Sequence, residues 1–182
     1  MNPPTSFNQC ASGKAARRRA ARHWRIRATI AATVVWVCLW SAAAQARVEV
    51  SAGRSFTSHH QWTDAGFIEW VGAARPVWRL HWAPAFGLGR FSARRNSTDL
   101  RLHHAVWVGA AGARLYLWRQ AFFGSQAAAT GGRTDALSSP YEFVSSLGWQ
   151  GRHWQLLVRH ISNGDLHKPN HGETMLLVGM AF

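Results

Sequence analysis

The sequence predicts an all-β fold, namely an eight-stranded antiparallel transmembrane β-barrel. Three observations predict this fold. Large apolar side chains alternate with small or polar ones along several segments, long polar connections alternate with short ones, and the chain contains 11 tryptophans in 182 residues. These features are typical of transmembrane barrels, whose strands face lipid on one side and a polar interior on the other, and whose interfacial girdles are rich in aromatic rings.

The first element, residues 1–46, is predicted to be a cleaved secretory signal peptide. Residues 17–27 are rich in arginine, residues 28–40 are apolar, and small residues precede the cleavage site expected after Ala46. This succession is the layout of a signal peptide. The apolar run is too short for a transmembrane helix, which needs about 20 residues, and a retained N-terminal anchor is the alternative. Residues 47–182 would then form the outer-membrane β-barrel as one domain.

Removal of this segment changes the charge of the chain and removes both cysteines. Seven of the 21 Lys and Arg residues precede position 47 and all eight acidic residues follow it. The remaining 14 basic and eight acidic residues give a net charge of +6 instead of +13. No basic helix or recognition motif follows, so no nucleic-acid partner is expected. A modest positive charge on an exported protein favours anionic surfaces such as phosphorylated lipid head groups.

The third predicted strand, residues 76–91, shows the alternation most clearly. A period of two over this length indicates a strand rather than a helix. Its small or polar parity would face the lumen and its apolar parity would face lipid, as in a transmembrane barrel. The apolar parity carries Trp78, Leu80, Trp82, Phe86 and Leu88.

Two later predicted strands repeat the alternation less regularly. Residues 138–149 carry Tyr141, Phe143, Leu147 and Trp149 on one parity, and residues 153–162 carry Trp154, Leu156 and Val158. The eight predicted strands cover residues 47–56, 64–72, 76–91, 100–110, 114–127, 138–149, 153–162 and 173–182. Eight is the smallest common number for such barrels, and side chains fill an interior of this size.

The connections between the strands and the C-terminal end support the same topology. The second, fourth and sixth connections are short (A-A-R, A-G-A and Q-G-R), while the other four are longer and polar. Outer-membrane barrels combine short periplasmic turns with longer external loops, which would place both termini in the periplasm. The final residue, Phe182, resembles the aromatic end of the last strand in bacterial outer-membrane proteins.

The stretch from Arg159 to Thr174 contains the candidate site. His160 and Ser162 would lie at the outer-leaflet end of the seventh predicted strand, on the lipid-facing parity of Val158, whereas Arg159 and Asn163 would face the lumen. Exposing an imidazole and a hydroxyl to acyl chains costs free energy unless they have partners. A polar pair at this position therefore favours a functional role.

A serine beside a histidine has the chemistry for ester cleavage. Ser162 would be the nucleophile and His160 would accept its proton and return it to the leaving alkoxide. A carboxylate on the other ring nitrogen would fix the tautomer and stabilise the imidazolium. Glu173 is the nearest acid on the neighbouring strand, and Asp165 on the loop is the alternative. The candidates for stabilising the oxyanion are Asn163, Asn170 and the backbone N–H of Gly164.

This stretch resembles the C-terminal signature of the bacterial lipid A 3-O-deacylases. The similar residues are His160-Ile161-Ser162-Asn163, Leu166, Lys168-Pro169-Asn170, Gly172 and Glu173. The resemblance is specific over residues 160–182 and looser over the barrel. It implies an outer-membrane serine esterase that removes the ester-linked 3-hydroxyacyl chain at position 3 of lipid A in the outer leaflet, without a metal or other cofactor.

The resemblance also implies roles for individual residues. Ser162 would be the nucleophile, His160 the base and Glu173 its orienting acid, with Asn163 and Asn170 near the oxyanion. One departure concerns the acid, because the family pattern has one more residue between the glycine and the glutamate. If Phe182 faces lipid, Thr174 does too and Glu173 points inward, unless a β-bulge absorbs one residue.

The partners expected from this interpretation are lipid A or lipopolysaccharide and the outer membrane, and a homodimer is left open. Two other functions also remain open. The first is a non-catalytic small outer-membrane barrel, serving as a structural or adhesion protein. The second is a soluble periplasmic β-domain that binds lipid, built as a sandwich around an aromatic core. The histidines show no compact metal-ligand spacing, so no metal is expected.

Overall fold

The computed structural model describes residues 46–94 and 101–182. The signal peptide predicted for residues 1–46 lies outside the described residues up to position 45, and so does the first residue of the strand predicted for 100–110. Along the described part of the chain, no helix is long and apolar enough to cross a membrane.

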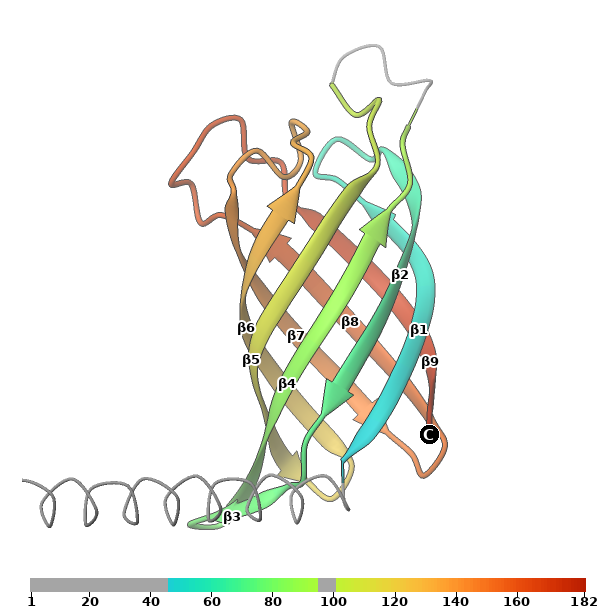
Figure 1. Ribbon diagram of the computed structural model, residues 1–182, viewed down its shortest axis with the longest axis vertical. Coiled ribbons are helices and arrows are strands. Elements are labelled where there is room, and N and C mark those ends of the chain that lie inside the picture. The colour runs from blue at the N-terminus through green and yellow to red at the C-terminus, as the bar shows by residue number, and fades with distance from the viewer. Residues whose placement is uncertain (1–45, 95–100) are drawn as a thin grey trace, which may run out of the picture. The chain divides into compact units, whose positions relative to one another are not determined.

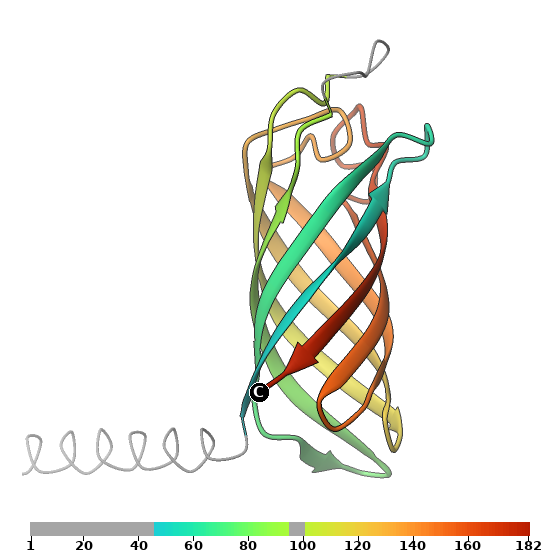
Figure 2. The same cartoon turned by 90° about the vertical axis from the view of Figure 1, so that its right-hand side faces the viewer.

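The described residues form a single antiparallel sheet that closes into a barrel (Figures 1 and 2). Its strands are β1 (Arg47–Phe56), β2 (Trp62–Val71), β3 (Arg75–Val77), β4 (Leu80–Phe91), β5 (Val106–Trp118), β6 (Ala121–Gly131), β7 (Tyr141–Gln150), β8 (Trp154–Ser162) and β9 (Glu173–Ala181). The order is β2-β1-β9-β8-β7-β6-β5-β4-β3, and pairing of β2 with β4 closes the wall. Because β3 pairs with β4 alone, the closed wall has eight strands, which confirms the predicted barrel.

The strands alternate between the two faces of the wall as predicted. In β4, Leu88 is 65% exposed on the outer face, whereas Ala85 is fully buried on the inner face. A strand sends successive side chains to opposite faces, so the period of two in the sequence becomes an apolar exterior. The exterior apolar side chains come from each of the eight strands of the wall, and they include Val50, Ile68, Leu88, Trp107, Phe123, Leu147, Val158 and Val178.

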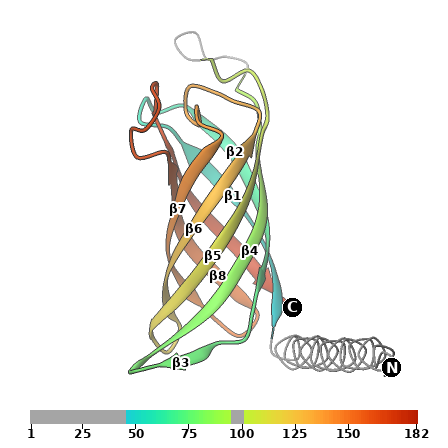
Figure 3. The same ribbon diagram turned by 60° about the vertical axis from the view of Figure 1, so that its left-hand side comes forward.

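The two ends of the barrel differ in the length of their connections (Figure 3). The long-loop end carries residues 57–61, 132–140 and 163–172 and the described residues 92–94 and 101–105. The short-turn end carries residues 72–79, 119–120 and 151–153, together with the start of β1 and the end of β9. Connections 119–120 and 151–153 are short, as predicted, whereas connection 72–79, which was predicted to be short, is longer than connection 57–61 because it includes β3.

One predicted turn lies at the wrong place. Residues 111–113 (A-G-A) are inside β5, and β5 turns into β6 at residues 119–120. The glycine in this triplet serves close strand packing, because a Cβ on Gly112 would come within 2.2 Å of the Ser125 carbonyl oxygen. Small residues at this point indicate a close approach of two backbones and not a turn.

The strand predicted for residues 76–91 is also interrupted. The chain reverses at Trp78, which has a φ of 53° and is 90% exposed, so that β3 folds back onto the start of β4. This hairpin lies at the short-turn end of the barrel (Figure 1). The outward parity of Phe86 and Leu88 is confirmed, but Trp78 belongs to a turn and not to the wall.

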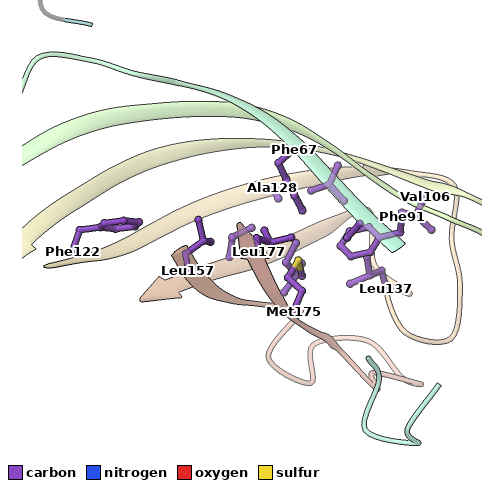
Figure 4. Packing of buried hydrophobic residues seen from close by; sticks show 13 residues of the cluster. Phe67, Phe91, Val106, Phe122, Ala128, Leu137, Leu157, Met175 and Leu177 are labelled. Carbon is purple, nitrogen blue, oxygen red and sulfur yellow. The ribbon is translucent and has the colours of Figure 1, made fainter. Parts of the chain in front are cut away.

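Side chains occupy the interior of the barrel in an apolar and a polar part. The apolar part includes Phe67, Phe91, Phe122, Leu137, Leu157, Met175 and Leu177 (Figure 4). The polar part is a cluster of buried ion pairs, Arg114 with Glu49 at 2.7 Å and with Glu69 at 3.0 Å, and Arg159 with Glu69 at 2.6 Å. Buried charges need such partners, because an unpaired one costs several kcal/mol.

Candidate functional site

The pairing of β8 with β9 decides which candidate residues share a face. His160 lies opposite Thr174, and Ile161 lies opposite Glu173. His160 is exposed on the outer face, whereas Ile161 and Glu173 are buried on the inner face. Arg159 is also buried, so the predicted parity of this strand is confirmed.

The imidazole of His160 is held by β9 and by the residue before it. Its Nδ1 forms a hydrogen bond of 2.9 Å with Thr174 Oγ1. Its ring also lies close to Gly172, where an added Cβ would come within 3.0 Å of Cε1 and 3.5 Å of Nε2. In the tautomer that carries its proton on Nδ1, the ring donates to Thr174 and its Nε2 is an acceptor. The ring is thus oriented with one nitrogen available for proton transfer.

Ser162 follows two residues later on the same face of β8. It is half-buried and pairs with Phe143 of β7. Ser162 and His160, both among the described residues, form no hydrogen bond with each other, so the pair shares a face without being joined. Hydrogen bonds at catalytic sites often form only with substrate bound.

The structure does not bring Glu173 to His160. The Glu173 carboxylate accepts two hydrogen bonds from the Arg94 guanidinium, of 2.7 and 2.8 Å, and a third of 2.5 Å from Ser55 Oγ. The pairing of β8 with β9 runs without a bulge from Trp154 to Ile161, so nothing shifts Glu173 to the outer face. The predicted contact between this acid and His160 is therefore not formed, and Thr174 stands in its place.

Asp165, the alternative acid, does not contact His160 either. Asp165 Oδ1 accepts a hydrogen bond of 3.3 Å from Asn170 Nδ2. Both residues belong to connection 163–172, and Asp165 has a φ of 65° that turns the chain there. This carboxylate stabilises the loop. In the described part of the chain, the base of the predicted triad therefore has the Thr174 hydroxyl as its partner and no carboxylate.

The two asparagines predicted near the oxyanion are also occupied. The Asn163 amide nitrogen donates to Ser138 Oγ at 3.2 Å and to the His167 carbonyl at 2.9 Å. Asn170 Oδ1 accepts from the Asn163 backbone N–H at 3.4 Å. These bonds hold connection 163–172 in place. They leave neither amide directed at the face that carries Ser162.

Gly164 is the remaining candidate for the oxyanion. It has a φ of 62°, and an added Cβ would lie 3.8 Å from the ring of Phe143, the residue that pairs with Ser162. Its backbone N–H has no hydrogen-bond partner among the residues that the structure describes. Of the three residues predicted to stabilise the oxyanion, Gly164 therefore lies next to the strand partner of Ser162, and its N–H has no partner among the described residues.

The arrangement supplies part of the chemistry that ester cleavage requires. Thr174 can fix the orientation and tautomer of His160, but a hydroxyl carries no charge to stabilise an imidazolium. Removing the charge of the carboxylate from a Ser-His-Asp triad lowers kcat by about 10⁴-fold. Within residues 46–94 and 101–182, no group of three His, Cys, Asp or Glu side chains is placed to hold a metal ion.

Sequence reasoning did not assign a role to Thr174, Gly172 or Arg94. The parity argument places Thr174 on the outer face, which is a sufficient signal to pair it with His160. Nothing in the sequence pairs Arg94 with Glu173, because these residues are 79 positions apart. Arg94 follows β4, whereas Glu173 begins β9.

Comparisons with known proteins give one similarity of fold. No family model matches the chain, and no curated protein sequence matches it significantly. Among solved structures, the chain is similar to the crystal structure of Neisserial surface protein A (NspA), with a TM-score of 0.46 and 10% sequence identity. The similarity covers 75% of this chain and 94% of that chain. It does not assign a function.

Proposed function

We propose that the protein is a small barrel of the bacterial outer membrane that acts without catalysis, as a structural or adhesion protein. The observation that supports this placement is the apolar exterior, to which each of the eight wall strands contributes large exposed side chains. Soluble monomers rarely expose a continuous apolar patch larger than a few hundred Å². The exterior of this barrel is therefore suited to lipid.

The exposed tryptophans and the exposed tyrosine lie near the two ends of the wall, as expected for a barrel in a bilayer. Toward the long-loop end are Trp62, Trp107 and Tyr141, and toward the short-turn end are Trp82, Trp118, Trp149 and Trp154. Aromatic girdles of this kind lie at the two membrane interfaces. The long loops would then face outward and the short turns would face the periplasm.

Membrane fractionation tests this placement. The protein expressed in a Gram-negative host should be found in the outer-membrane fraction, and its mobility on a denaturing gel should change on heating. A protein recovered in the soluble fraction, without heat-modifiable mobility, would overturn the placement and favour the soluble β-domain.

The partners of the two acids support the non-catalytic role. Glu173 is held by Arg94 and Ser55, and Asp165 by Asn170. Among the residues that the structure describes, His160 therefore has no partner with the negative charge that makes a histidine an effective base in a triad. We expect mass spectrometry to find the same lipid A in cells that express the protein and in cells that express Ser162→Ala.

A lipid A 3-O-deacylase is the second candidate, favoured by the hydrogen bond that orients His160 on the face of Ser162. His160 Nε2 would take the proton of Ser162 Oγ, which attacks the ester carbonyl of the 3-hydroxyacyl chain. The Gly164 N–H would stabilise the oxyanion. His160 would return the proton to the departing alkoxide, and water would then hydrolyse the acyl-enzyme.

The same mass spectrometry experiment distinguishes the two candidates. Loss of one 3-hydroxyacyl group with the parent protein, and none with Ser162→Ala or His160→Ala, would support the deacylase and overturn the non-catalytic role. The variants should still fractionate with the outer membrane, because their side chains lie outside the buried interior.

A further inference from the structure

A cavity of about 450 Å³ opens at the long-loop end of the barrel. Three connections supply its walls, through residues 101–104, 133–138 and 168–169. Its lining is mainly basic and polar, and comprises Arg101, His103, His104, Arg133, Thr134, Asp135, Ser138, Lys168 and Pro169. Its volume lies in the range of ligand sites, about 300–1,000 Å³.

The charge of the cavity is positive. Arg101, Arg133 and Lys168 are cations, and Asp135 is the one acid in the lining. Asp135 is engaged by Arg101, through an ion pair of 3.4 Å and a hydrogen bond of 2.8 Å from the Arg101 backbone N–H. Within residues 46–94 and 101–182, neither Arg133 nor Lys168 forms an ion pair. These two cations and the two histidines line the cavity.

Backbone hydrogen bonds join the three walls through Asp135. Its N–H donates to the Arg101 carbonyl at 3.3 Å, and its own carbonyl accepts from His171 N–H at 3.4 Å. Next to it, the Ala136 carbonyl accepts from Gly172 N–H at 3.0 Å. The cavity is thus preformed, which reduces the ordering cost of binding.

Two buried residues pack two of these walls against each other. Leu102 and Ala136 are buried against each other, next to the lining residues Arg101 and Asp135. The Leu102 carbonyl also accepts a hydrogen bond of 2.8 Å from Arg94 N–H, at the end of the wall. Apolar packing therefore holds the base of the cavity while its cationic side chains stay exposed.

We propose that this cavity binds a phosphate monoester carried on a saccharide, as in the head group of the lipopolysaccharide that surrounds an outer-membrane barrel. A phosphate monoester carries about −1.5 to −2 charges at neutral pH and several strong acceptor oxygens. Arg133 and Lys168 supply charge-assisted donors for it. The volume exceeds that of phosphate alone and accommodates a sugar ring. The choice of ligand rests on the proposed outer-membrane placement.

Titration of the purified full-length protein in detergent micelles tests the site. The probes are a bisphosphorylated diglucosamine without acyl chains, the unphosphorylated diglucosamine and inorganic phosphate. We expect the bisphosphorylated disaccharide to bind at least tenfold more tightly than either other probe. Its affinity should fall at least about tenfold in Arg133→Gln/Lys168→Gln, because charged hydrogen bonds are lost, and should weaken as salt is added.

The matched control is Arg152→Gln, which removes an exposed cation in connection 151–153 at the opposite end of the barrel. It should leave the affinity unchanged. Equal binding of the phosphorylated and unphosphorylated disaccharides, or an unchanged affinity in the double variant, would overturn the proposal. Inorganic phosphate binding as tightly as the disaccharide would overturn its saccharide part and assign the cavity to free phosphate.

Failure of the site and failure of the membrane placement have different readouts. The binding curve reports on the cavity, and fractionation of the same proteins reports on the placement. The double variant should keep its heat-modifiable mobility, because both substituted side chains are exposed on loops.

Discussion

Two sets of polar side chains lie on opposite sides of the barrel wall, although they alternate in sequence along β8 and β9. The inner set, Arg159 and Glu173, is buried, and its charges are held by several partners. The outer set, His160, Ser162 and Thr174, contains one hydrogen bond in the described structure, between His160 and Thr174. Closeness in sequence therefore does not place an acid at the serine and histidine, because strand alternation sends it across the wall.

The two sets are also expected to contribute differently to the free energy of unfolding. A buried charge that loses its partner costs several kcal/mol, since it stays out of water without compensation. Substitution of a polar side chain on the outer face removes at most one weak hydrogen bond and should cost less free energy. Substitutions on the inner face should therefore lower the free energy of unfolding. Substitutions on the outer face should change activity or have no effect.

The largest effect is expected for Arg159→Ala. Arg159 pairs with Glu69 at 2.6 Å, donates to Ser146 Oγ at 3.0 Å and lies 4.5 Å from the centroid of the Phe67 ring. Its removal leaves Glu69 with a single cation, Arg114, and opens space in the interior. The free energy of unfolding should fall by about 3–5 kcal/mol, measured by urea unfolding of the barrel in lipid vesicles.

Arg152→Ala is the control for this substitution. Arg152 is an exposed arginine in connection 151–153, and in the described chain it forms no ion pair. Its removal should not change the unfolding midpoint. Similar midpoints for Arg159→Ala and the parent would show that the lumen cluster does not stabilise the barrel, and the distinction between the two faces would fail.

A smaller loss of stability is expected for Glu173→Gln. The amide keeps the shape of the side chain but removes the charge that pairs with Arg94, so the guanidinium stays buried and partly unsatisfied. The free energy of unfolding should fall by about 1.5–3 kcal/mol, the range for hydrogen bonds to charged groups. Arg94→Gln should cost a similar amount in the same urea experiment.

Glu173→Gln also tests the placement of this acid. If lipid A hydrolysis is detected in the parent, the folded variant should retain it, because Glu173 does not contact His160. Loss of hydrolysis in a variant that still inserts and shows the heat-modifiable mobility would contradict the inner position of Glu173 and restore its role as the orienting acid.

The fold could be predicted because strand alternation is a local signal. Trp154, Leu156 and Val158 indicate one face of β8, and that parity carries through to His160 and Ser162. The same argument placed Thr174 outside and Glu173 inside. The assignment of Glu173 as the acid rested instead on its place at the start of the neighbouring strand and on the resemblance to the deacylases.

Other features could not be predicted because they depend on residues far apart in the chain. Arg94 meets Glu173 only when the barrel closes, and Leu102 meets Ala136 only when two loops pack together. The turn at residues 119–120 was missed since Gly112 looks like a turn residue in sequence, whereas in the barrel it allows β5 to approach β6 closely.

The smallest effect on stability, and the sharpest test of the outer face, is expected for Thr174. Thr174→Val removes the hydroxyl that bonds His160 Nδ1 at 2.9 Å and should change the free energy of unfolding by less than about 0.5 kcal/mol. Thr174→Glu supplies the missing carboxylate at the position opposite His160. If His160 and Ser162 form an ester-cleaving pair, this variant should raise the rate of lipid A deacylation at least tenfold, because a carboxylate stabilises the imidazolium that forms as Ser162 loses its proton.

Mass spectrometry of lipid A from cells that express Thr174→Glu measures this gain, with Thr174→Gln as the uncharged match and Thr174→Glu/Ser162→Ala as the control for the nucleophile. Only the charged variant with an intact serine should release the 3-hydroxyacyl chain at the higher rate. If the charged variant releases no more than its uncharged match while remaining in the outer membrane, His160 and Ser162 do not form an ester-cleaving pair. The outer face that carries His160 and Ser162 would then have no catalytic role, because an oriented histidine with a charged partner would still be insufficient for ester cleavage.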